Sequence, residues 1–223
     1  TGAASGDTVV FTSTTENATV PAALANTGTG TVTITSVSTG KAHNATATGG
    51  VMGIANALVD ITATASVTTV TVDGFAGANK IQDAATNTAL ATINLSNGDN
   101  MTIDSAAATL ALNLNNVTGT VDVKANTTII NAKVDGDSTA TIESATVKTL
   151  NVTAGNGEFS TDASSAGAIV ATAISTVGFT GTANVTLDGA TTTYTGGASV
   201  DNVTVADATT GAAIAKAIDL GAG

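Results

Sequence analysis

The chain has no cysteine, no arginine and no tryptophan, and its only proline is Pro21. Without cysteine, neither a disulfide framework nor a thiolate zinc site is available. Aromatic residues make up only 2% of the chain, although 43% of its residues are hydrophobic. Because aromatic side chains usually fill much of a wide globular core, their scarcity predicts a narrow core lined by short aliphatic residues.

Basic residues are also scarce: six lysines stand against 14 aspartates and 3 glutamates, which gives a net charge of −11. Binding to nucleic acid or to an anionic membrane surface requires clustered Lys or Arg. We therefore expect no nucleic-acid partner and no membrane insertion. The charge suits divalent cations, and Asp in turns is a typical Ca²⁺ ligand. Asp is also favoured in turns for conformational reasons, so its excess has two explanations.

A catalytic site finds little support in the sequence. The single histidine, His43, has no nearby carboxylate, which argues against a catalytic triad and against a zinc site. Enzymes that cleave polysaccharides on β-helical folds need basic residues beside paired carboxylates, together with aromatic residues that stack on sugars. No signal peptide and no apolar run long enough to span a membrane is visible. We expect that the protein is not an enzyme.

Threonine, by contrast, accounts for 46 of the 223 residues, and short segments that alternate between polar and aliphatic residues recur along the chain. Such alternation is typical of β-strands. One residue from each of five successive segments gives a spacing of 8 or 9 residues: Leu95, Ile103, Leu112, Val121 and Ile129. Two strands per coil then predict about 18 residues per turn of a solenoid. The expected fold is all-β, a right-handed parallel β-helix or β-solenoid with glycine-rich turns and one or two short helices.

We divide the chain into an irregular β segment at 1–66, a β-solenoid at 67–157, and a short helix followed by further coils at 158–223. The helix is predicted between Thr161 and Thr176, where apolar residues follow helical spacing and Asp162 or Ser164 would cap the start. We expect this helix to pack on the solenoid or to cap it.

The clearest binding motif lies between Thr195 and Thr204. Against the nonapeptide G-G-x-G-x-D-x-U-x of calcium-binding parallel β-rolls, four residues fall on the consensus and Ser199 replaces the third glycine. The four are Gly196, Gly197, Asp201 and Val203. The glycines allow a sharp turn in which backbone carbonyls approach a cation, Asp201 supplies a charged oxygen, and Val203 turns into the core as the strand begins.

Two further stretches resemble the same motif. Gly2 and Asp7 match it near the start of the chain, with Ala3 and Ser5 in place of glycines. Leu220 begins a partial copy 24 residues after Gly196, an offset that suits one enlarged coil. We therefore expect the chain to be a fragment of a longer repetitive protein. The candidate Ca²⁺ ligands are Asp201, Gly196, Gly197, Asp7, Gly2 and Asp219. Other aspartates in glycine-rich turns are better explained as turn residues: Asp73, Asp99, Asp135, Asp137 and Asp188.

The region from Tyr194 to Gly223, supported by Gly2 to Val9, resembles the β-solenoid of RTX-type surface-layer proteins of Gram-negative bacteria. Those proteins place a motif of the form T-G-G-A-G-x-D-x-x before a short Ala/Thr strand and a further G-A-G-x-D turn, and their bias toward Ala, Thr, Asn and Gly is similar. This chain departs from the pattern at Ser5 and Ser199, and its middle holds no intact nonapeptide. Calcium is therefore expected at the two ends only, or not in this part at all.

The resemblance implies RTX-like turns, type I secretion, calcium-dependent folding outside the cell and self-assembly into a two-dimensional lattice. We therefore expect a structural component of a bacterial surface layer (S-layer), located on the cell exterior. Its partners would be copies of itself, with any contact to surface polysaccharide made through another part of the parent chain. The alternative is a stalk segment of a secreted RTX-type adhesin, which needs the same calcium-stiffened rod.

Overall fold

The structure, a computed structural model, describes residues 8–13, 30–36, 54–55, 58–60, 67–76, 79–83, 90–161, 169–188, 192–206 and 216–222. Every regular element among these residues is a β-strand. The strands are β1 (Thr8–Ser13), β2 (Gly30–Ser36), β3 (Ile54–Ala55), β4 (Leu58–Asp60), β5 (Val67–Ala76), β6 (Asn79–Gln82), β7 (Thr92–Gly98), β8 (Met101–Ser105), β9 (Thr109–Val117), β10 (Thr120–Ala125), β11 (Ile129–Asp135), β12 (Thr139–Glu143), β13 (Thr149–Ala154), β14 (Glu158–Thr161), β15 (Ala173–Ser175), β16 (Thr182–Asp188), β17 (Thr193–Thr195), β18 (Val200–Ala206) and β19 (Ile218–Asp219).

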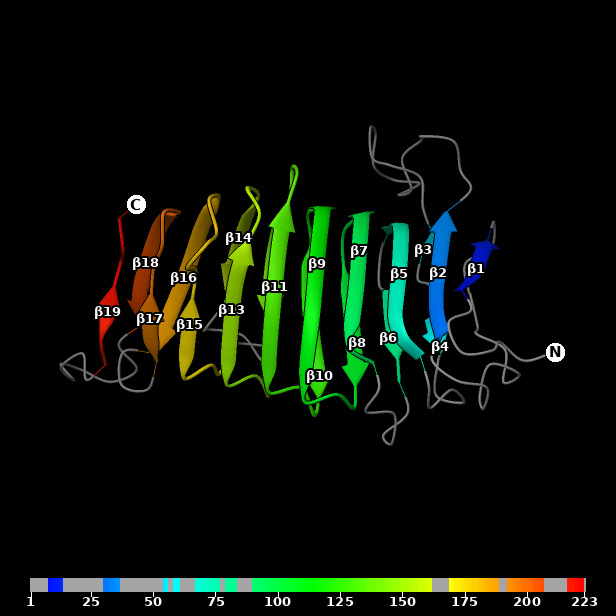
Figure 1. Ribbon diagram of the computed structural model, residues 1–223, viewed down its shortest axis with the longest axis horizontal. Coiled ribbons are helices and arrows are strands. Elements are labelled where there is room, and N and C mark those ends of the chain that lie inside the picture. The colour runs from blue at the N-terminus through cyan, green and yellow to red at the C-terminus, as the bar shows by residue number, and fades with distance from the viewer. Residues whose placement is uncertain are drawn as a thin grey trace.

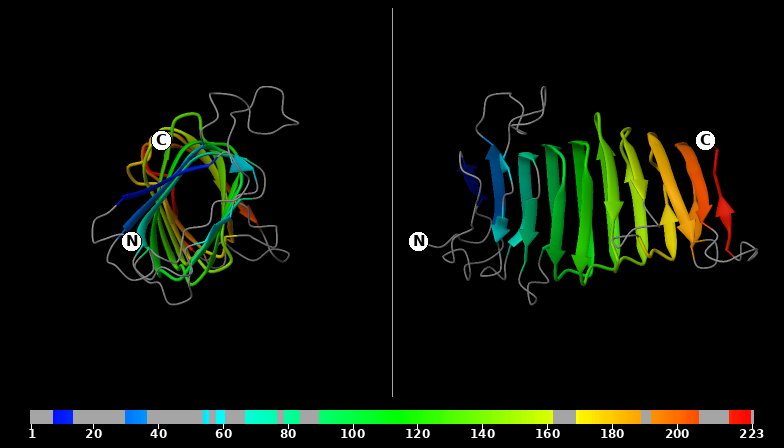
Figure 2. Two further views of the ribbon diagram at one scale, coloured as in Figure 1. Left: turned by 90° about the vertical axis from the view of Figure 1, so that its right-hand side faces the viewer. Right: turned by 180° about the vertical axis from the view of Figure 1, so that it is seen from behind.

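The strands form two parallel sheets that face each other across a common interior (Figures 1 and 2). Sheet A runs in the order β1-β2-β5-β7-β9-β11-β13-β15-β17-β19, with β3 beside β5, and sheet B runs β18-β16-β14-β12-β10-β8-β6-β4. From β4 onward, successive strands alternate between the two sheets, and each strand pairs in parallel with the strand two places later. This is the topology of a β-solenoid, as the sequence predicts.

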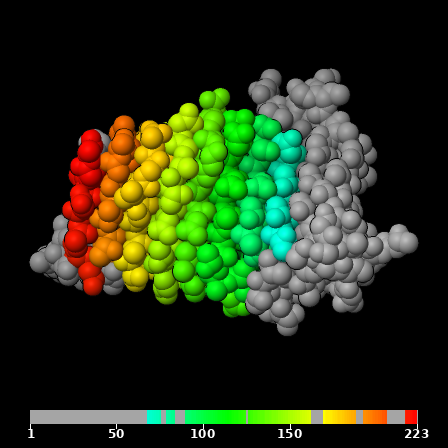
Figure 3. Space-filling view, viewed as in Figure 1, coloured from blue at the N-terminus to red at the C-terminus, as the bar shows by residue number. Residues whose placement is uncertain are grey.

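The coils are longer and less uniform than predicted. Across the pairings from β7 to β14, paired residues are offset by 19 to 21 positions. The offset is 18 where Thr182 pairs with Val200, and 24 where Tyr194 pairs with Ile218. The predicted period of 18 is therefore the lower limit, while the enlarged coil of 24 residues predicted after Gly196 is present. In the space-filling view, successive coils cross the visible face as adjacent bands (Figure 3).

The core consists of the residues that alternate inward along each strand. Leu95, Ile103, Leu112 and Val121 lie in β7, β8, β9 and β10 in turn, and each side chain is at most 1% exposed. The fifth predicted residue, Ile129, is partly exposed, because Ile130 occupies the inward position in β11. The spacing of 8 or 9 residues thus identified the alternation between sheets correctly, with an error of one residue in β11.

The interior is not limited to short aliphatic side chains. Four aromatic residues are at most 1% exposed: Phe75, Phe159, Phe179 and Tyr194. Phe159 pairs with Ala140 on one side and Ala183 on the other, so small neighbours in the adjacent coils leave room for its ring. The rings of Phe159 and Phe179 meet edge to face, with centroids 5.5 Å apart. Phe159 therefore fits the core at a position where both neighbouring coils carry small side chains.

One corner of the solenoid has the same backbone conformation in four successive coils. Gly74, Asn97, Asn116 and Gly136 all have positive φ, between 52° and 73°. They follow four residues that are in register across sheet A, namely Asp73, Ser96, Asn115 and Asp135. Gly and Asn are the residues that most readily adopt this conformation. The Gly- and Asn-containing turns of these coils therefore lie along one edge of sheet A.

The helix predicted between Thr161 and Thr176 is wrong for its described residues. Thr161 ends β14, and Ala173–Ser175 form β15, while residues 162–168 lie outside the described part. Ala173 and Ser175 pair in parallel with β13, and Ile174 between them is buried, so sheet pairing overrides the helical spacing. The described ranges contain no helix. Both sheets run across the boundaries drawn at 66/67 and 157/158, since β2 pairs with β5 and β12 pairs with β14.

Candidate functional site

The predicted motif forms the corner between β17 and β18, near the C-terminal end of the described solenoid. The backbone N–H of Gly196 donates a 2.6 Å hydrogen bond to the carbonyl of Asp219 in the next coil, and the carbonyl of Gly197 accepts one of 2.9 Å from the same coil. A Cβ on Gly196 would overlap Oδ2 of Asp201 and the carbonyl oxygen of Leu220. Glycine is therefore required for this close approach to the next coil.

Asp201 lies in β18 itself rather than in the turn before it. It pairs with Ala183, which pairs with Phe159, so Asp201 continues a row of core residues and its side chain faces inward. Its Oδ1 accepts a 2.5 Å hydrogen bond from Ser199. Its Oδ2 is buried and has no hydrogen-bond partner. The strand begins three residues earlier than expected, because Val200 already pairs with Thr182 of β16.

Three buried polar residues to which the motif assigns no role lie around this carboxylate. Thr176 and Tyr194 share a 3.1 Å hydrogen bond between their hydroxyl groups, and the hydroxyl oxygens of Ser199 and Thr176 lie 3.3 Å apart. All three side chains are at most 1% exposed. Sequence reasoning had two signals available here. The only tyrosine of the chain directly precedes the Thr195-Gly-Gly corner, and a serine replaces the third glycine.

The Tyr194 hydroxyl is held in its protonated form. Burial raises the pKa of Tyr194 well above its usual value, and the hydrogen bond and negative charge of Asp201 act in the same direction. The hydrogen bond to Thr176 opposes this shift, but the effect of burial is larger. Tyr194 is therefore a neutral hydrogen-bonding group beside Asp201, with no negative charge of its own to add to a cation site.

The other predicted ligands do not join Asp201 through their side chains. Asp219 pairs with the exposed Thr195 and faces outward from sheet A, where its Oδ1 accepts a 2.9 Å hydrogen bond from the N–H of Gly221. Its carbonyl, as described above, contacts Gly196. Gly2 and Asp7 lie outside the described residues, as does His43.

Two of the other aspartates are engaged by a neighbouring coil or by lysine. Asp73 accepts 2.7 Å hydrogen bonds from Ser96 and from Asn97. Asp135 forms an ion pair with Lys133. In the described ranges, no group of three or more His, Asp or Glu side chains is placed to hold a metal ion together. A cation at the Gly196–Asp201 corner would therefore be held by one carboxylate together with hydroxyl and carbonyl oxygens.

Two further ion pairs lie on the outer face of sheet B. Lys80 lies 2.6 Å from Asp104, and Lys124 lies 3.0 Å from Asp122. The hydrogen bond and charge of Asp122 raise the pKa of Lys124. These pairs are solvent-exposed, so they contribute little to stability, and no described lysine approaches the Asp201 carboxylate within ion-pair distance.

The part of the chain that the structure describes contains no helix long and apolar enough to cross a membrane. Compared with protein-family models, with curated proteins and with solved structures, the chain matches none of them.

Proposed function

We propose that this chain is a segment of a bacterial surface-layer protein, a calcium-stabilised β-solenoid that packs beside other copies in a two-dimensional lattice on the cell exterior. The resemblance around Tyr194 to Gly223 motivates the assignment. The stacked coils are consistent with it, because a solenoid of this kind presents long flanks to its neighbours.

A single observation carries the calcium part of the proposal: Oδ2 of Asp201 is buried without a hydrogen-bond partner. A buried carboxylate oxygen that lacks a hydrogen-bond partner is costly unless a cation or a proton compensates the charge. The hydroxyl of Ser199 and the carbonyl oxygen of Leu220 lie close by, and hard oxygens of these kinds are what Ca²⁺ prefers. When bound, Ca²⁺ would neutralise the carboxylate. With the ion in place, Asp201 and the carbonyl oxygen of Leu220 would link β18 to the following coil.

The outer faces of the two sheets support lateral packing through polar contacts. Their outward positions carry mostly Thr, Asn and Ser, with side chains that hydrogen-bond from coil to coil, as Asn113 does to Asn94 and Asn151 to Asn131. A net charge of −11 opposes the approach of identical copies. Divalent cations reduce that repulsion, so we expect lattice formation to require Ca²⁺.

Thermal unfolding in Ca²⁺ and in EGTA tests the calcium part, with Asp201→Ala as the variant and Asp137→Ala as the matched control, since Asp137 lies exposed in another glycine-rich turn. At tenfold saturation one ion adds about 1.4 kcal/mol, which for a chain of this size raises Tm by about 3–6 °C. The wild type and Asp137→Ala should show this rise, and Asp201→Ala should not. In EGTA, Asp201→Ala should melt at or above the wild-type temperature, because the variant removes an uncompensated buried charge. Identical wild-type melts in the two buffers would refute the calcium site.

Electron microscopy of the parent protein on cells tests the lattice. A regular two-dimensional array that dissolves in EGTA supports the surface-layer assignment. Sparse separate fibrils would contradict it and would favour the stalk of an RTX-type adhesin instead.

A further inference from the structure

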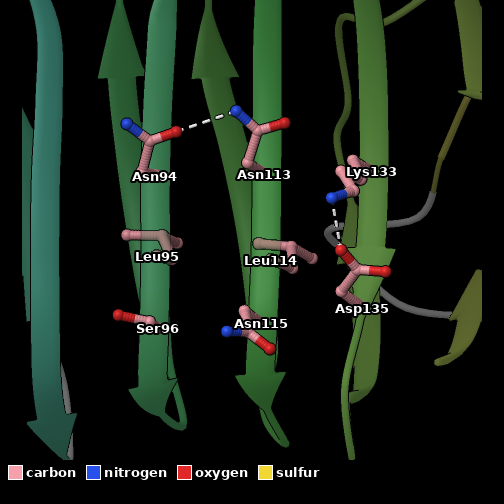
Figure 4. Close-up of a pocket in the computed structure, with 8 residues that line it drawn as sticks. All are labelled: Asn94, Leu95, Ser96, Asn113, Leu114, Asn115, Lys133 and Asp135. Carbon is pink, nitrogen blue, oxygen red and sulfur yellow. Dashed lines mark hydrogen bonds and ion pairs between the residues drawn. The ribbon is translucent and has the colours of Figure 1, made fainter. Parts of the chain in front are cut away.

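A shallow groove crosses the outer face of sheet A, several coils away from the Gly196–Asp201 corner. It has a volume of about 390 Å³ and lies over β7, β9 and β11 (Figure 4). The floor consists of the backbone of the strands at Leu95 and Leu114, whose side chains turn into the core. The remaining lining is polar: Asn94, Ser96, Asn113, Asn115, Lys133 and Asp135.

The groove lies where a ladder of side-chain amides stops. Asn94 donates to the hydroxyl of Thr71 at 3.0 Å, and Asn113 donates to Oδ1 of Asn94 at 2.8 Å. The next residue in register is Lys133, which cannot accept a hydrogen bond from an amide. Its ammonium group turns along its own strand and pairs with Asp135 instead (Figure 4). The space between β9 and β11 is therefore left open on the outside.

Unused hydrogen-bonding capacity faces this space. Oδ1 of Asn113 receives no hydrogen bond from the described residues, and the exposed side-chain amide of Asn115 makes none. Lys133 has donors beyond the one directed at Asp135, and that carboxylate has further acceptor positions. The backbone positions that carry these groups are about 4.8 Å apart between neighbouring strands and about 6.7 Å apart between alternate residues along a strand.

We infer that this groove binds a neutral glycan. Sugar hydroxyls donate and accept at the same atom, which is what a surface of amides, a hydroxyl and an ion pair requires. The ion pair leaves the lining without net charge, and the surrounding chain carries −11, so an acidic polysaccharide is repelled. The inferred site lies within this chain, and it depends on neither calcium nor lattice formation.

Binding at such a site is weak for each groove. None of the residues that line the groove is aromatic, so the lining offers no ring to stack on a sugar face. Recognition then relies on hydrogen bonds, each of which replaces one to water and contributes only modestly. We expect a dissociation constant on the order of 1 mM. Many copies on one surface would hold a long glycan through multivalency.

Side-chain amide resonances of Asn113 and Asn115, followed by NMR, test the inference. The ¹⁵N-labelled chain is titrated with neutral gluco-, manno- and galacto-oligosaccharides and with oligogalacturonate, in Ca²⁺ and again in EGTA. The expected result is saturable shifts at these amides with at least one neutral series. Asn115→Ala should weaken binding about threefold to tenfold, as expected for one lost hydrogen bond, and Asn113→Ala with Asn115→Ala should abolish it.

Asn151→Ala is the matched control, because Asn151 donates to Asn131 in the same type of ladder outside the groove, and this variant should bind like the wild type. Saturation with oligogalacturonate alone, equal loss in Asn151→Ala, or no shift with any neutral series at the solubility limit would each overturn the inference. Because the titration is repeated in EGTA, its failure is distinguishable from failure of the calcium proposal.

Discussion

The side-chain amide of Asn116 donates a 3.0 Å hydrogen bond to Oδ1 of Asn97, its counterpart one coil earlier, and both residues have positive φ. Asn97 in turn donates to Asp73 at 2.7 Å, and Oδ1 of Asn116 accepts from the N–H of Asp137 at 2.9 Å. Four coils are thus joined at one corner by side chains that run parallel to the backbone ladder. At this corner Asn has two roles: its backbone adopts the left-handed conformation at low cost, and its side-chain amide continues the series of hydrogen bonds from coil to coil.

This corner predicts different effects for two substitutions at the same position. Asn116→Gly removes two hydrogen bonds but keeps the backbone relaxed, so it should lower the free energy of unfolding by about 1–2 kcal/mol. Asn116→Ala adds the cost of a left-handed alanine, about 1–2 kcal/mol more. Urea unfolding of both variants measures the difference, with the exposed Asn126→Ala as the control. Equal stability of the Gly and Ala variants would contradict the role of backbone conformation.

Gly98 is the partner of Phe75 in sheet A, and a Cβ at residue 98 would overlap the phenylalanine ring. Gly98→Ala should therefore cost about 1–3 kcal/mol through overpacking. In a Phe75→Leu background the added methyl group meets a smaller side chain, so the cost should shrink. A double-mutant cycle on unfolding free energies should give a coupling of about 0.5–3 kcal/mol. Strict additivity would show that the ring does not determine the requirement for glycine.

The edge-to-face pair of Phe159 and Phe179 should be visible as a coupling in its own right. Each truncation to Ala should cost about 3–5 kcal/mol. The double variant should lose less than the sum of the two, by about 0.5–1.5 kcal/mol. Phe75→Ala combined with Phe179→Ala is the control, because these rings lie in distant coils and their effects should add.

Tyr194 predicts how stability changes at alkaline pH. Its pKa is raised in the folded state, so the protonated form contributes its full stability below the unfolded pKa of about 10. Above that pH the unfolded state loses its proton first, and stability falls as pH rises. Tyr194→Phe should flatten this part of the profile of unfolding free energy against pH. Tyr194 is the only tyrosine of the chain, so tyrosinate absorbance should appear in step with unfolding. Absorbance that rises before unfolding would contradict a buried hydroxyl.

Much of the fold could be predicted from the sequence, because the period of a parallel solenoid appears in the local pattern of polar and aliphatic residues. Leu95, Ile103, Leu112 and Val121 alternate between the sheets as their spacing indicates. The predictions that were wrong concerned features that depend on contacts between coils. Residues 173–175 join a strand because β13 offers a partner, and Phe159 fits inside because its neighbours are alanines. Neither fact is visible without the register.

At the candidate site, the glycines were easier to predict than the carboxylate. Gly196 approaches the next coil closely, which a motif of consecutive glycines indicates. The orientation of Asp201 depends on where β18 begins, and a shift of one residue reverses the face of every side chain. The buried hydroxyls of Thr176 and Tyr194 come from the preceding coil and from β17, so the nonapeptide spacing carries no information about their distance to Asp201.

The parallel pairing also determines how the molecule responds to force. Hydrogen bonds between coils run along the long axis in Figure 1, and each coil contacts only its neighbours. A pull along that axis therefore loads one ladder at a time and peels the outermost coil, rather than shearing many bonds together. The central coils contain about 20 residues each, so force–extension traces should lengthen in steps of about 70 Å. The solenoid would therefore unfold coil by coil under tension rather than in a single event.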